Sequence, residues 1–350
     1  MIDKRVYTKD YIESIVQKYK ADPQIVERAV FALGLLEALV LSEADFIFKG
    51  GTALMLLFER PFRLSTDVDI IVRPDYDIEA YLKRASEIYP FVRYEEKTRV
   101  GANKIVKKHY KFYYESLSNR TKEIPILLDV LFEENHYVTV LKKEIKTEFI
   151  EVVNNHVFVN IPSPDSILGD KLTAFAPHTI GVIQIIMRTD GKYIDKRIEV
   201  IKQFFDVDCL CDVSNNFDEV LQTYKQTSLS EIGYRGLSIS YKDCLMDCFD
   251  AALSIASRGK WMVNDYNDYL FGIRGLTNYL INVKFNAETA YKQASKVMYL
   301  AACLLKEKTI ESDIPDAIPF SNEFAIINNI RKIDKDAFNL IARSISLIKE

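Results

Sequence analysis

The sequence predicts an α+β fold, in which a half built on a mixed β-sheet precedes an all-helical half. Strand-like and helical segments alternate up to about Pro162, whereas nearly every segment from Ser163 onward has the apolar spacing of a helix. The chain has 350 residues, enough for one large domain or two medium ones. We therefore expect two domains, residues 1–162 and 163–350.

Composition excludes several classes of protein. Hydrophobic residues make up 48% and charged residues 27% of the chain, which is ordinary for a soluble globular protein. A net charge of -4 gives no general attraction to nucleic acid, so a polyanion site must be a local patch. The polar N-terminus has no signal-peptide core, and no apolar run is long enough to cross a bilayer. We expect a cytoplasmic protein with five reduced cysteines, most of them in the core.

Periodicity locates the elements of the first half. Residues 24–41 carry apolar side chains at helical spacing, and Thr52 to about Glu59 reads as a short helix stopped by Pro61. Another helix is predicted at 77–89. Strands are predicted at 46–48, 67–72, 91–97, 104–114, 124–132 and 156–161. The second half opens with a helix start, Ser163 before Pro164.

An Asp-x-Asp pair opens the strand at 67–72. Alternation along a strand places Ser65, Asp67 and Asp69 on one face and the apolar residues on the other. Two ionised carboxylates on one face repel unless a cation lies between them, and Mg²⁺ commonly binds one or two carboxylates together with substrate phosphates. The alternative is that both carboxylates only solvate the outer face of an edge strand.

A glycine turn lies about fifteen residues before this strand. Gly50 and Gly51 would let the backbone approach a ligand closely, and the helix that starts at Thr52 would direct its first N–H groups towards a phosphate. The alternative is an ordinary tight turn. Beside a metal-holding strand, however, the turn predicts a site for a nucleoside triphosphate.

A third carboxylate, Asp129, lies within the apolar segment 124–132. A lone Asp in a buried strand is costly unless it is paired or binds a metal. It is therefore a third candidate site residue. The alternative is an Asp at a strand end that is hydrogen-bonded to a neighbour.

The stretch FKGGTALMLLFERPFRLSTDVDIIV resembles the first motif of the AbiEii/AbiGii toxin family of nucleotidyltransferases, within the DNA polymerase β-like superfamily. The family typically has a Lys-Gly-Gly-Thr-x-Leu turn followed by an Arg-x-Ser-x-Asp-x-Asp strand. The residues that carry the resemblance are Lys49, Gly50, Gly51, Thr52, Leu54, Arg63, Ser65, Asp67 and Asp69.

Two further family signatures fall in the helical half. A Lys on the first helix after the sheet domain corresponds to Lys171. A basic helix with an aromatic-Asp pair is matched loosely by RIEVIKQFFDVDCL, in which Phe205-Asp206 fits best. The Lys-Asp pair expected before the aromatics is Lys202-Gln203 here, which leaves both Asp206 and Asp208 open as the family's acidic residue.

The resemblance implies transfer of a nucleoside monophosphate from an NTP to a hydroxyl, with release of pyrophosphate. Asp67 and Asp69 would hold Mg²⁺ or Mn²⁺, and Asp129 would help to activate the attacking hydroxyl. Lys171 would neutralise charge on the phosphates, while Asp206 would orient Lys171 or bind the nucleotide. The triphosphate would bind to Lys49, Gly50, Gly51, Thr52, Arg63 and Ser65, although Arg63 has a structural role as its alternative.

The same resemblance implies partners, with the tRNA 3′ end as acceptor and a cognate antitoxin protein. A basic, aromatic hairpin near 93–113 is a candidate RNA-binding surface, with an ordinary solvated hairpin as the alternative. Its residues are Arg93, Tyr94, Lys97, Arg99, Lys104, Lys107, Lys108, Tyr110, Lys111, Phe112 and Tyr113. Residues 188–202 form a second basic candidate.

Two other functions fit the same donor-site residues. One is a non-catalytic module that binds a nucleotide or RNA, which the intact Ser-x-Asp-x-Asp pattern disfavours. The other is a kinase-like phosphotransferase that modifies a protein or small-molecule hydroxyl.

Overall fold

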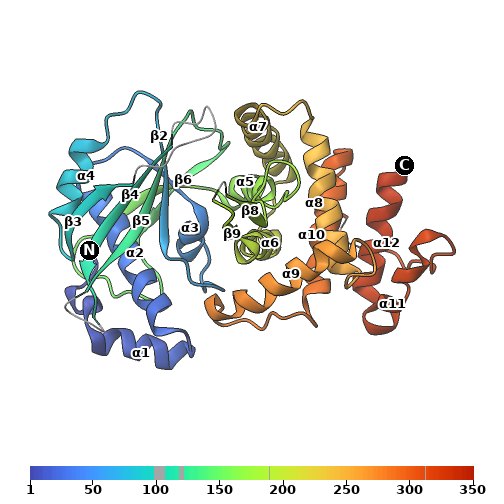
Figure 1. Ribbon diagram of the computed structural model, residues 1–350, viewed down its shortest axis with the longest axis horizontal. Helices are drawn as coiled ribbons and strands as arrows, with labels where there is room; N and C mark the ends of the chain where they lie inside the picture. Colours follow the sequence, from blue (N-terminus) through green and yellow to red (C-terminus); the bar gives the residue numbers. More distant parts are fainter. Residues whose placement is uncertain (98–106, 118–121, 189, 312) are drawn as a thin grey trace. The chain divides into compact units, whose positions relative to one another are not determined.

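The computed structural model describes residues 1–97, 107–117, 122–188, 190–311 and 313–350 (Figure 1). It is an α+β protein with a mixed five-stranded sheet, followed by a helical region, so the predicted fold class is confirmed. The chain divides into two compact units. The first comprises Met1–Ser163 and Asn278–Lys284, and the second comprises Pro164–Thr277 and Phe285–Glu350.

The first unit is built on a sheet whose strand order is β1-β2-β5-β4-β3. The sheet is mixed, because β2 pairs with β5 in parallel whereas the other adjacent strands pair antiparallel. These two strands are not consecutive in sequence, so their pairing brings distant segments together. The strands are β1 (Ile47–Lys49), β2 (Asp67–Val72), β3 (Phe91–Glu96), β4 (Lys107–Glu115) and β5 (Glu123–Phe132).

One face of this sheet forms the core of the unit. Val68 and Ile70 of β2 are buried, as are Tyr110 and Phe112 of β4. Helix α2 (Pro23–Leu41) packs on β2 and β5, and its apolar residues are almost all buried. Because side chains alternate along each strand, the opposite face carries the polar residues.

Shorter elements complete the first unit. The helices are η1 (Lys4–Tyr7), α1 (Lys9–Tyr19), α3 (Gly50–Leu57) and α4 (Glu79–Ser86). The predicted strand at 156–161 is β7 (Phe158–Pro162), which pairs with β6 (Val140–Glu144) in a separate two-stranded sheet. Sequence periodicity missed α1 and β6.

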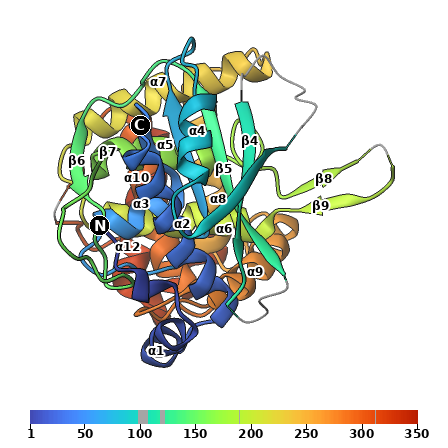
Figure 2. The same cartoon turned by 90° about the vertical axis from the view of Figure 1, so that its left-hand side faces the viewer.

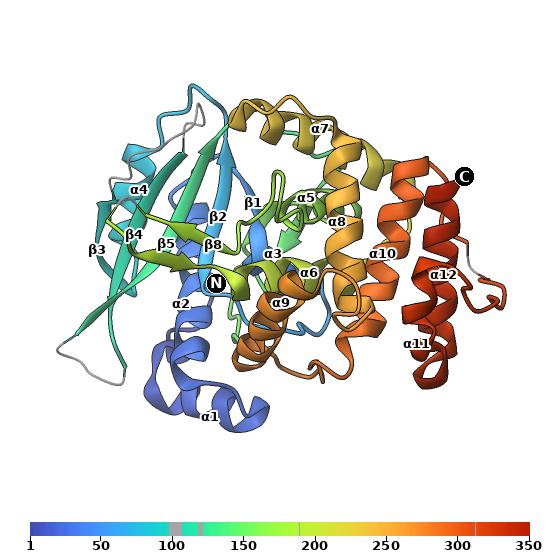
Figure 3. The same cartoon turned by 45° about the vertical axis from the view of Figure 1, so that its right-hand side comes forward.

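The second unit is mainly helical, and helices α8, α10 and α12 pack side by side (Figures 1 and 3). Its α-helices are α5 (Pro164–Ala174), α6 (Arg197–Cys211), α7 (Phe217–Arg235), α8 (Tyr241–Ala256), α9 (Val263–Leu276), α10 (Ala290–Lys306), α11 (Asn329–Ile333) and α12 (Lys335–Lys349). Its 3-10 helices are η2 (Thr277–Tyr279), whose last two residues belong to the first unit, and η3 (Glu323–Ile327). No helix in the described ranges is long and apolar enough to cross a membrane.

The second unit departs from the all-helical expectation at one place. A two-stranded hairpin, β8 (Ile185–Met187) and β9 (Tyr193–Asp195), lies in the connection between α5 and α6. These segments are short, and each has three paired residues, which is too little for a periodic signal.

Candidate functional site

The polar face of β2 carries both aspartates of the Asp-x-Asp pair. Val68 and Ile70 are fully buried on the core face, whereas Asp67 is exposed and Asp69 is partly buried on the other. The alternation expected for this strand is therefore confirmed, and both carboxylates project from the side of the sheet that is opposite to the core.

Four ionisable residues form a row across this polar face. The register places Lys49 of β1 opposite Asp69 of β2, Asp69 opposite Asp129 of β5, and Asp129 opposite His109 of β4. Residues directly opposite in adjacent strands project from the same face. The pairing of β2 with β5 thus brings Asp129 next to Asp69, although sixty residues separate them in sequence.

Asp129 is held by two residues of β4. His109 Nδ1 lies 2.6 Å from Asp129 Oδ1, and Lys107 Nζ lies 2.9 Å from Asp129 Oδ2. Burial alone would raise the pKa of Asp129. The charge of Lys107 and the hydrogen bonds from His109 and Lys107 outweigh that effect and lower the pKa below its usual range. Asp129 is therefore ionised and paired, well inside β5 rather than at its end.

Asp69 behaves in the opposite way. Burial raises its pKa to about 6, and the negative charges of Asp129 and Asp67 add to the rise, while Lys107 and Lys49 oppose it. Three carboxylates thus lie at this face, and Asp69 is more difficult to ionise than Asp129. A cation bound beside Asp69 would remove this penalty.

The Gly-Gly turn lies directly against these side chains. Gly50 has φ +81°, and a Cβ there would lie 2.1 Å from Asp69 Oδ2. At Gly51 a Cβ would lie 2.4 Å from Arg63 Nη2 and 2.9 Å from Ser65 Oγ. No larger residue fits at either position without displacing a neighbour. The turn, Asp69 and Ser65 are therefore brought together in one place.

Helix α3 begins at Gly50, and its N-cap residue, Lys49, provides no side-chain hydrogen bond to its first N–H groups. The buried Thr52 donates its hydroxyl to the carbonyl oxygen of Asp67, at 2.5 Å. This hydrogen bond fixes the start of α3 against the start of β2. Thr52 therefore positions the turn through its side chain.

Arg63 is buried, and its contacts reach a distant segment of the chain. It forms an isolated bridge with Leu280, and Nη1 donates to the carbonyl oxygen of Leu64 at 3.2 Å. The amide of Leu64 donates to the carbonyl oxygen of Tyr279 at 2.8 Å. These backbone contacts explain why residues 278–284 belong to the first unit, while the guanidinium of Arg63 lies against Gly51 of the turn.

In the second unit, Lys171 of α5 forms a buried ion pair with Asp206 of α6, with Nζ 2.8 Å from Oδ2. Gln203, at the position where the family pattern has Asp, accepts a second hydrogen bond from Lys171 Nζ at 2.9 Å. Asp208 instead pairs with Lys296 of α10, at 2.8 Å. The structure thus distinguishes the two aspartates, because Asp206 is the partner of Lys171.

The basic hairpin differs from the expectation in its described part. Tyr110 and Phe112 are fully buried on the core face, so the idea that they stack on bases is wrong. Its cations are largely paired with carboxylates. Arg93 pairs with Glu123 and Glu95, Lys107 with Asp129, Lys108 with Glu79, and Lys111 with Glu95. Arg99, Lys104 and the turn at 101–103 lie outside the described residues.

Sequence reasoning did not find His109, and it placed Lys107 in a surface patch. Both lie at alternate positions of β4 that face Asp129. The i, i+2 spacing of the two residues is a weak signal, because it acquires meaning only when β4 is known to pair with β5.

The described residues supply only part of the ligand set of a metal site at this face. Among the described residues, no three His, Cys, Asp or Glu side chains gather as a metal-binding group. The donor set still fits a hard divalent cation that takes part of its ligands from a substrate, since two carboxylates at i and i+2 suffice for such a site. The raised pKa of Asp69 and the glycine turn against its carboxylate agree with a cation at this position.

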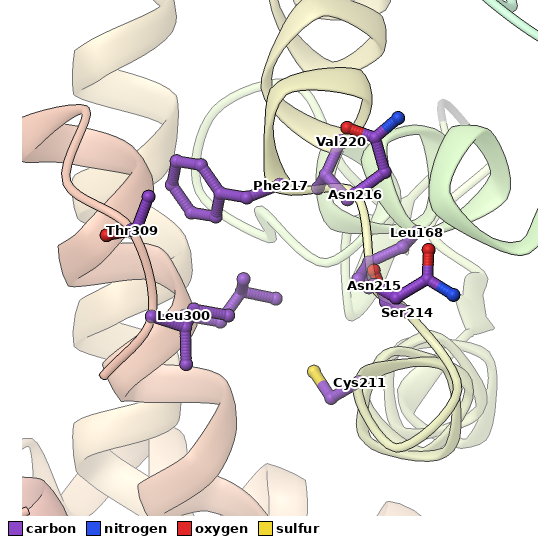
Figure 4. A pocket seen from close by; sticks show the side chains of 10 residues that line it. Leu168, Cys211, Ser214, Asn215, Asn216, Phe217, Val220, Leu300 and Thr309 are labelled. Carbon is purple, nitrogen blue, oxygen red and sulfur yellow. The ribbon is translucent and has the colours of Figure 1, made fainter. Parts of the chain in front are cut away.

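A separate cavity of about 320 Å³ lies in the second unit (Figure 4). Leu168, Cys211, Phe217 and Leu300 are among the side chains that line it, together with Ser214, Asn215 and Asn216. Lys171 and Asp206 do not line it. The cavity is therefore distinct from the residues that the sequence singled out.

A family model matches a large part of the chain. Residues 34–240 match the family model described as "Nucleotidyl transferase AbiEii toxin, Type IV TA system". This range is more than half of the chain, and it includes the Gly-Gly turn, β2, β5, Lys171 and Asp206. No curated protein matches the chain.

Proposed function

The chain belongs to the AbiEii nucleotidyl transferase toxin family of type IV toxin–antitoxin systems, and on this premise we propose that it transfers a nucleoside monophosphate from an NTP to an acceptor hydroxyl, releasing pyrophosphate. One observation carries the proposal. The glycine turn packs directly on Asp69 and Ser65, so that a helix N-terminus and an acidic strand converge. A phosphate site beside a carboxylate pair is what a metal-dependent transfer at phosphorus requires.

Asp67 and Asp69 would hold Mg²⁺ or Mn²⁺. When bound, the metal would neutralise the triphosphate and polarise the phosphorus that is attacked. For this chain, the consequence lies in the protonation of Asp69. With a pKa of about 6, Asp69 is mostly ionised at neutral pH. At slightly lower pH, protons would compete with the metal for its carboxylate.

The backbone of Gly50 and Gly51 would bind the β- and γ-phosphates through N–H groups at the start of α3. Ser65 lies against Gly51 and could donate its hydroxyl to the same phosphates. Lys49 faces Asp69 across the strand pair and would add a positive charge. Thr52 and Arg63 would act indirectly, by holding the turn and its following loop in place.

Asp129 would accept the proton of the attacking hydroxyl. Its hydrogen bond with His109 orients the carboxylate, and the charge of Lys107 keeps it ionised. For transfer to occur, the acceptor oxygen bonds to the α-phosphorus, the bond to the pyrophosphate oxygen breaks, and the hydroxyl proton leaves to the base.

Lys171 would stabilise negative charge on the phosphates as a point charge. Its contacts are compatible with such a role, because Asp206 and Gln203 hold the ammonium group in one position. This assignment rests on the family pattern together with these two contacts.

The acceptor that we propose is RNA, with the 3′ end of tRNA as the form that the family resemblance favours. As a toxin of this family, the protein would be controlled by a cognate antitoxin protein. The described part of the 93–113 hairpin lends little support to RNA binding, because its cations are paired and two of its aromatics are buried.

The test is label transfer. The purified chain is incubated with total tRNA, Mg²⁺ and each α-³²P-labelled NTP in turn, and the products are separated on a denaturing gel. A labelled band of tRNA size that is lost with Asp67→Ala supports the proposal. Retained transfer in Asp67→Ala would contradict it.

The same material separates the alternative functions. Mass spectrometry of the product distinguishes the gain of a nucleoside monophosphate from the gain of phosphate alone, which would indicate a kinase-like reaction. Thermal stabilisation by NTP and Mg²⁺ without any transfer would indicate a module that only binds nucleotide.

A further inference from the structure

The hairpin formed by β8 and β9 extends beyond the helices of its own unit (Figure 2). Most of its side chains are exposed, and several of them are large and apolar. The exposed apolar residues of the hairpin and its approach are Ile183, Ile185, Met187, Tyr193 and Ile194. A cluster of this kind on a projecting element is typical of a contact surface for a partner.

Two exposed side chains lie opposite each other at the outer end of the hairpin. Met187 and Tyr193 are directly opposite in the two strands, so their side chains lie on the same face. They are 69% and 63% exposed, respectively. An exposed tyrosine ring offers a stacking surface for a base, and a neighbouring thioether packs well against aromatic rings.

Basic residues lie on both sides of this pair along the hairpin. Arg188 and Lys192 flank the turn, and Lys196 follows β9. Across residues 185–197, four basic side chains stand against the two acidic side chains of Asp190 and Asp195. Within the described part of the chain, neither Lys192 nor Lys196 forms an ion pair. Arg188 pairs with Asp190, and Arg197 pairs with Asp195 and Asp268, so the contrast with the 93–113 segment rests on Lys192 and Lys196.

The root of the hairpin is fixed to the helices. Arg197 makes two hydrogen bonds to Asp195 and one to Asp268 of α9, and its guanidinium lies 3.7 Å from the ring of Phe271. The amide of Lys196 donates to the carbonyl oxygen of Gln184 at 2.7 Å, which closes the base of the hairpin. These contacts hold the exposed end at a set position relative to α6 and α9.

The hairpin also connects the two helices that carry the Lys171–Asp206 pair. It follows α5, which bears Lys171, and it leads directly into α6, which bears Asp206. Asp206 lies nine residues beyond Arg197, a distance of about 14 Å along the helix axis. The hairpin is thus continuous in the chain with both helices that carry this pair.

We propose that the β8–β9 hairpin binds a single-stranded segment of the acceptor RNA, with bases stacked on Tyr193 and Met187 and phosphates bound by Arg188, Lys192 and Lys196. This inference rests on the proposed function, since it identifies where that activity binds its acceptor. Lys192 and Lys196, which form no ion pair in the described part of the chain, favour a polyanion over a protein, because a protein contact built on the apolar residues alone does not require them.

The experiment measures RNA affinity and label transfer in the full chain. The probe is a fluorescein-labelled stem-loop RNA with a four-nucleotide single-stranded 3′ end, compared with the same stem-loop with a blunt end. The variants are Met187→Ala/Tyr193→Ala and Lys192→Ala/Lys196→Ala. The matched control is Tyr89→Ala, which removes a tyrosine of similar exposure from the first unit.

The expected result is that the aromatic variant weakens binding of the overhang RNA about tenfold or more. The charge variant should weaken binding and lower the slope of log Kd against log salt concentration by about one to two phosphate contacts. Tyr89→Ala should bind like the wild type. All variants should keep the wild-type thermal stabilisation by NTP and Mg²⁺, because the changes are confined to the hairpin.

Several outcomes would overturn the inference. If the wild type labels RNA and both hairpin variants bind and label RNA within twofold of it, the hairpin assignment is wrong and the proposed activity stands. If the wild type neither binds nor labels RNA, the RNA acceptor and the hairpin assignment both fail. A hairpin that instead captures a protein partner through Met187 and Tyr193 would also overturn it.

Discussion

The two units treat buried charge in opposite ways. On the polar face of the sheet, Asp69 lies beside Asp67 and Asp129, and its pKa rises to about 6. In the helical unit, Lys171 and Asp206 are more deeply buried than Asp69, yet their opposite charges are only 2.8 Å apart. In the first arrangement repulsion between carboxylates is only partly offset by Lys107 and Lys49, whereas in the second two opposite charges are paired directly.

This difference can distinguish a site that binds a charged ligand from an ion pair that stabilises the fold. Like charges at one face cost free energy of folding until a ligand removes the repulsion. A buried ion pair costs free energy chiefly when one partner is lost. Substitutions at the two places should therefore change stability with opposite signs, even if both of them abolish transfer.

The largest effect is expected for Lys171→Met. This change leaves Asp206 buried without its cation, and we expect a loss of about 3–5 kcal/mol in the free energy of unfolding. Urea denaturation followed by circular dichroism would measure it. The double variant Lys171→Met/Asp206→Leu should recover most of the stability, because it removes both charges.

A matched control is Lys225→Met, which removes one member of the exposed pair with Glu307. It should cost less than about 1 kcal/mol, since exposed pairs contribute little. Equal losses for Lys171→Met and Lys225→Met would show that the buried pair contributes no more than a surface one.

The second effect has the opposite sign and is expected for Asp69→Asn. The pKa of Asp69 is about 6, against about 3.9 in an unfolded chain, so its ionisation opposes folding on the order of 2–3 kcal/mol at pH 8. Asp69→Asn should therefore raise the free energy of unfolding at pH 8 while label transfer falls roughly 100-fold or more. A destabilised Asp69→Asn chain would contradict the repulsion inferred at this face.

The third prediction concerns pH. A carboxyl whose folded pKa is raised binds its proton more tightly in the folded state, so its contribution to stability is lost as pH rises. For Asp69 the loss should run from about pH 4 to about pH 6 and then level off. The difference in unfolding free energy between wild type and Asp69→Asn should grow across that window. A constant difference would show that Asp69 titrates normally.

The transfer activity should also depend on the ionisation of Asp69, but it should rise with pH where the stability falls. Metal binding needs ionised Asp69, so transfer should fall as pH drops through about 6, and more Mg²⁺ should partly restore it. A transfer rate that is independent of pH between 5 and 7.5 would separate Asp69 from the metal site.

Much of the fold and part of the site followed from local patterns. Helix α2 has a long 3.6-residue apolar periodicity. The alternation of polar and apolar residues in β2 predicted which residues face the core. Gly50 and Asp69 lie close enough in sequence for one motif to include both. Such features depend on neighbours along the chain, which a single sequence records.

What could not be predicted depends on pairing between distant segments. The sequence singled out Asp129 but not its neighbours, since Asp129 lies opposite Asp69 through the pairing of β5 with β2 and opposite His109 through the pairing of β5 with β4. The burial of Tyr110 also depends on strand pairing. The sequence suggested that its ring could stack on RNA bases, but the ring lies in the core. Residues 278–284 contact the first unit through backbone hydrogen bonds and through Asn282, which donates to Glu148 Oε1 at 3.0 Å, and neither contact leaves a periodic pattern in the sequence.

The smallest effect distinguishes the contact at the glycine turn from its backbone conformation. Gly50→Ala introduces a Cβ at φ +81° and places it 2.1 Å from Asp69 Oδ2. Gly236→Ala is the matched control, because Gly236 has φ +63° and nothing lies within 4 Å of its Cβ position. Both changes should cost about 1 kcal/mol for the backbone, and Gly50→Ala about 1–2 kcal/mol more for the collision.

The excess at Gly50 should depend on Asp69. In Gly50→Ala/Asp69→Ala the colliding carboxylate is absent, so the two substitutions should couple by roughly 1 kcal/mol in a double-mutant cycle. Urea denaturation of the four chains measures this coupling. Additive losses in the free energy of unfolding would mean that the alanine Cβ at position 50 does not contact the carboxylate of Asp69. Coupled losses would show in solution that the turn and the acidic strand are in contact, which is the feature on which a phosphate site beside a carboxylate pair depends.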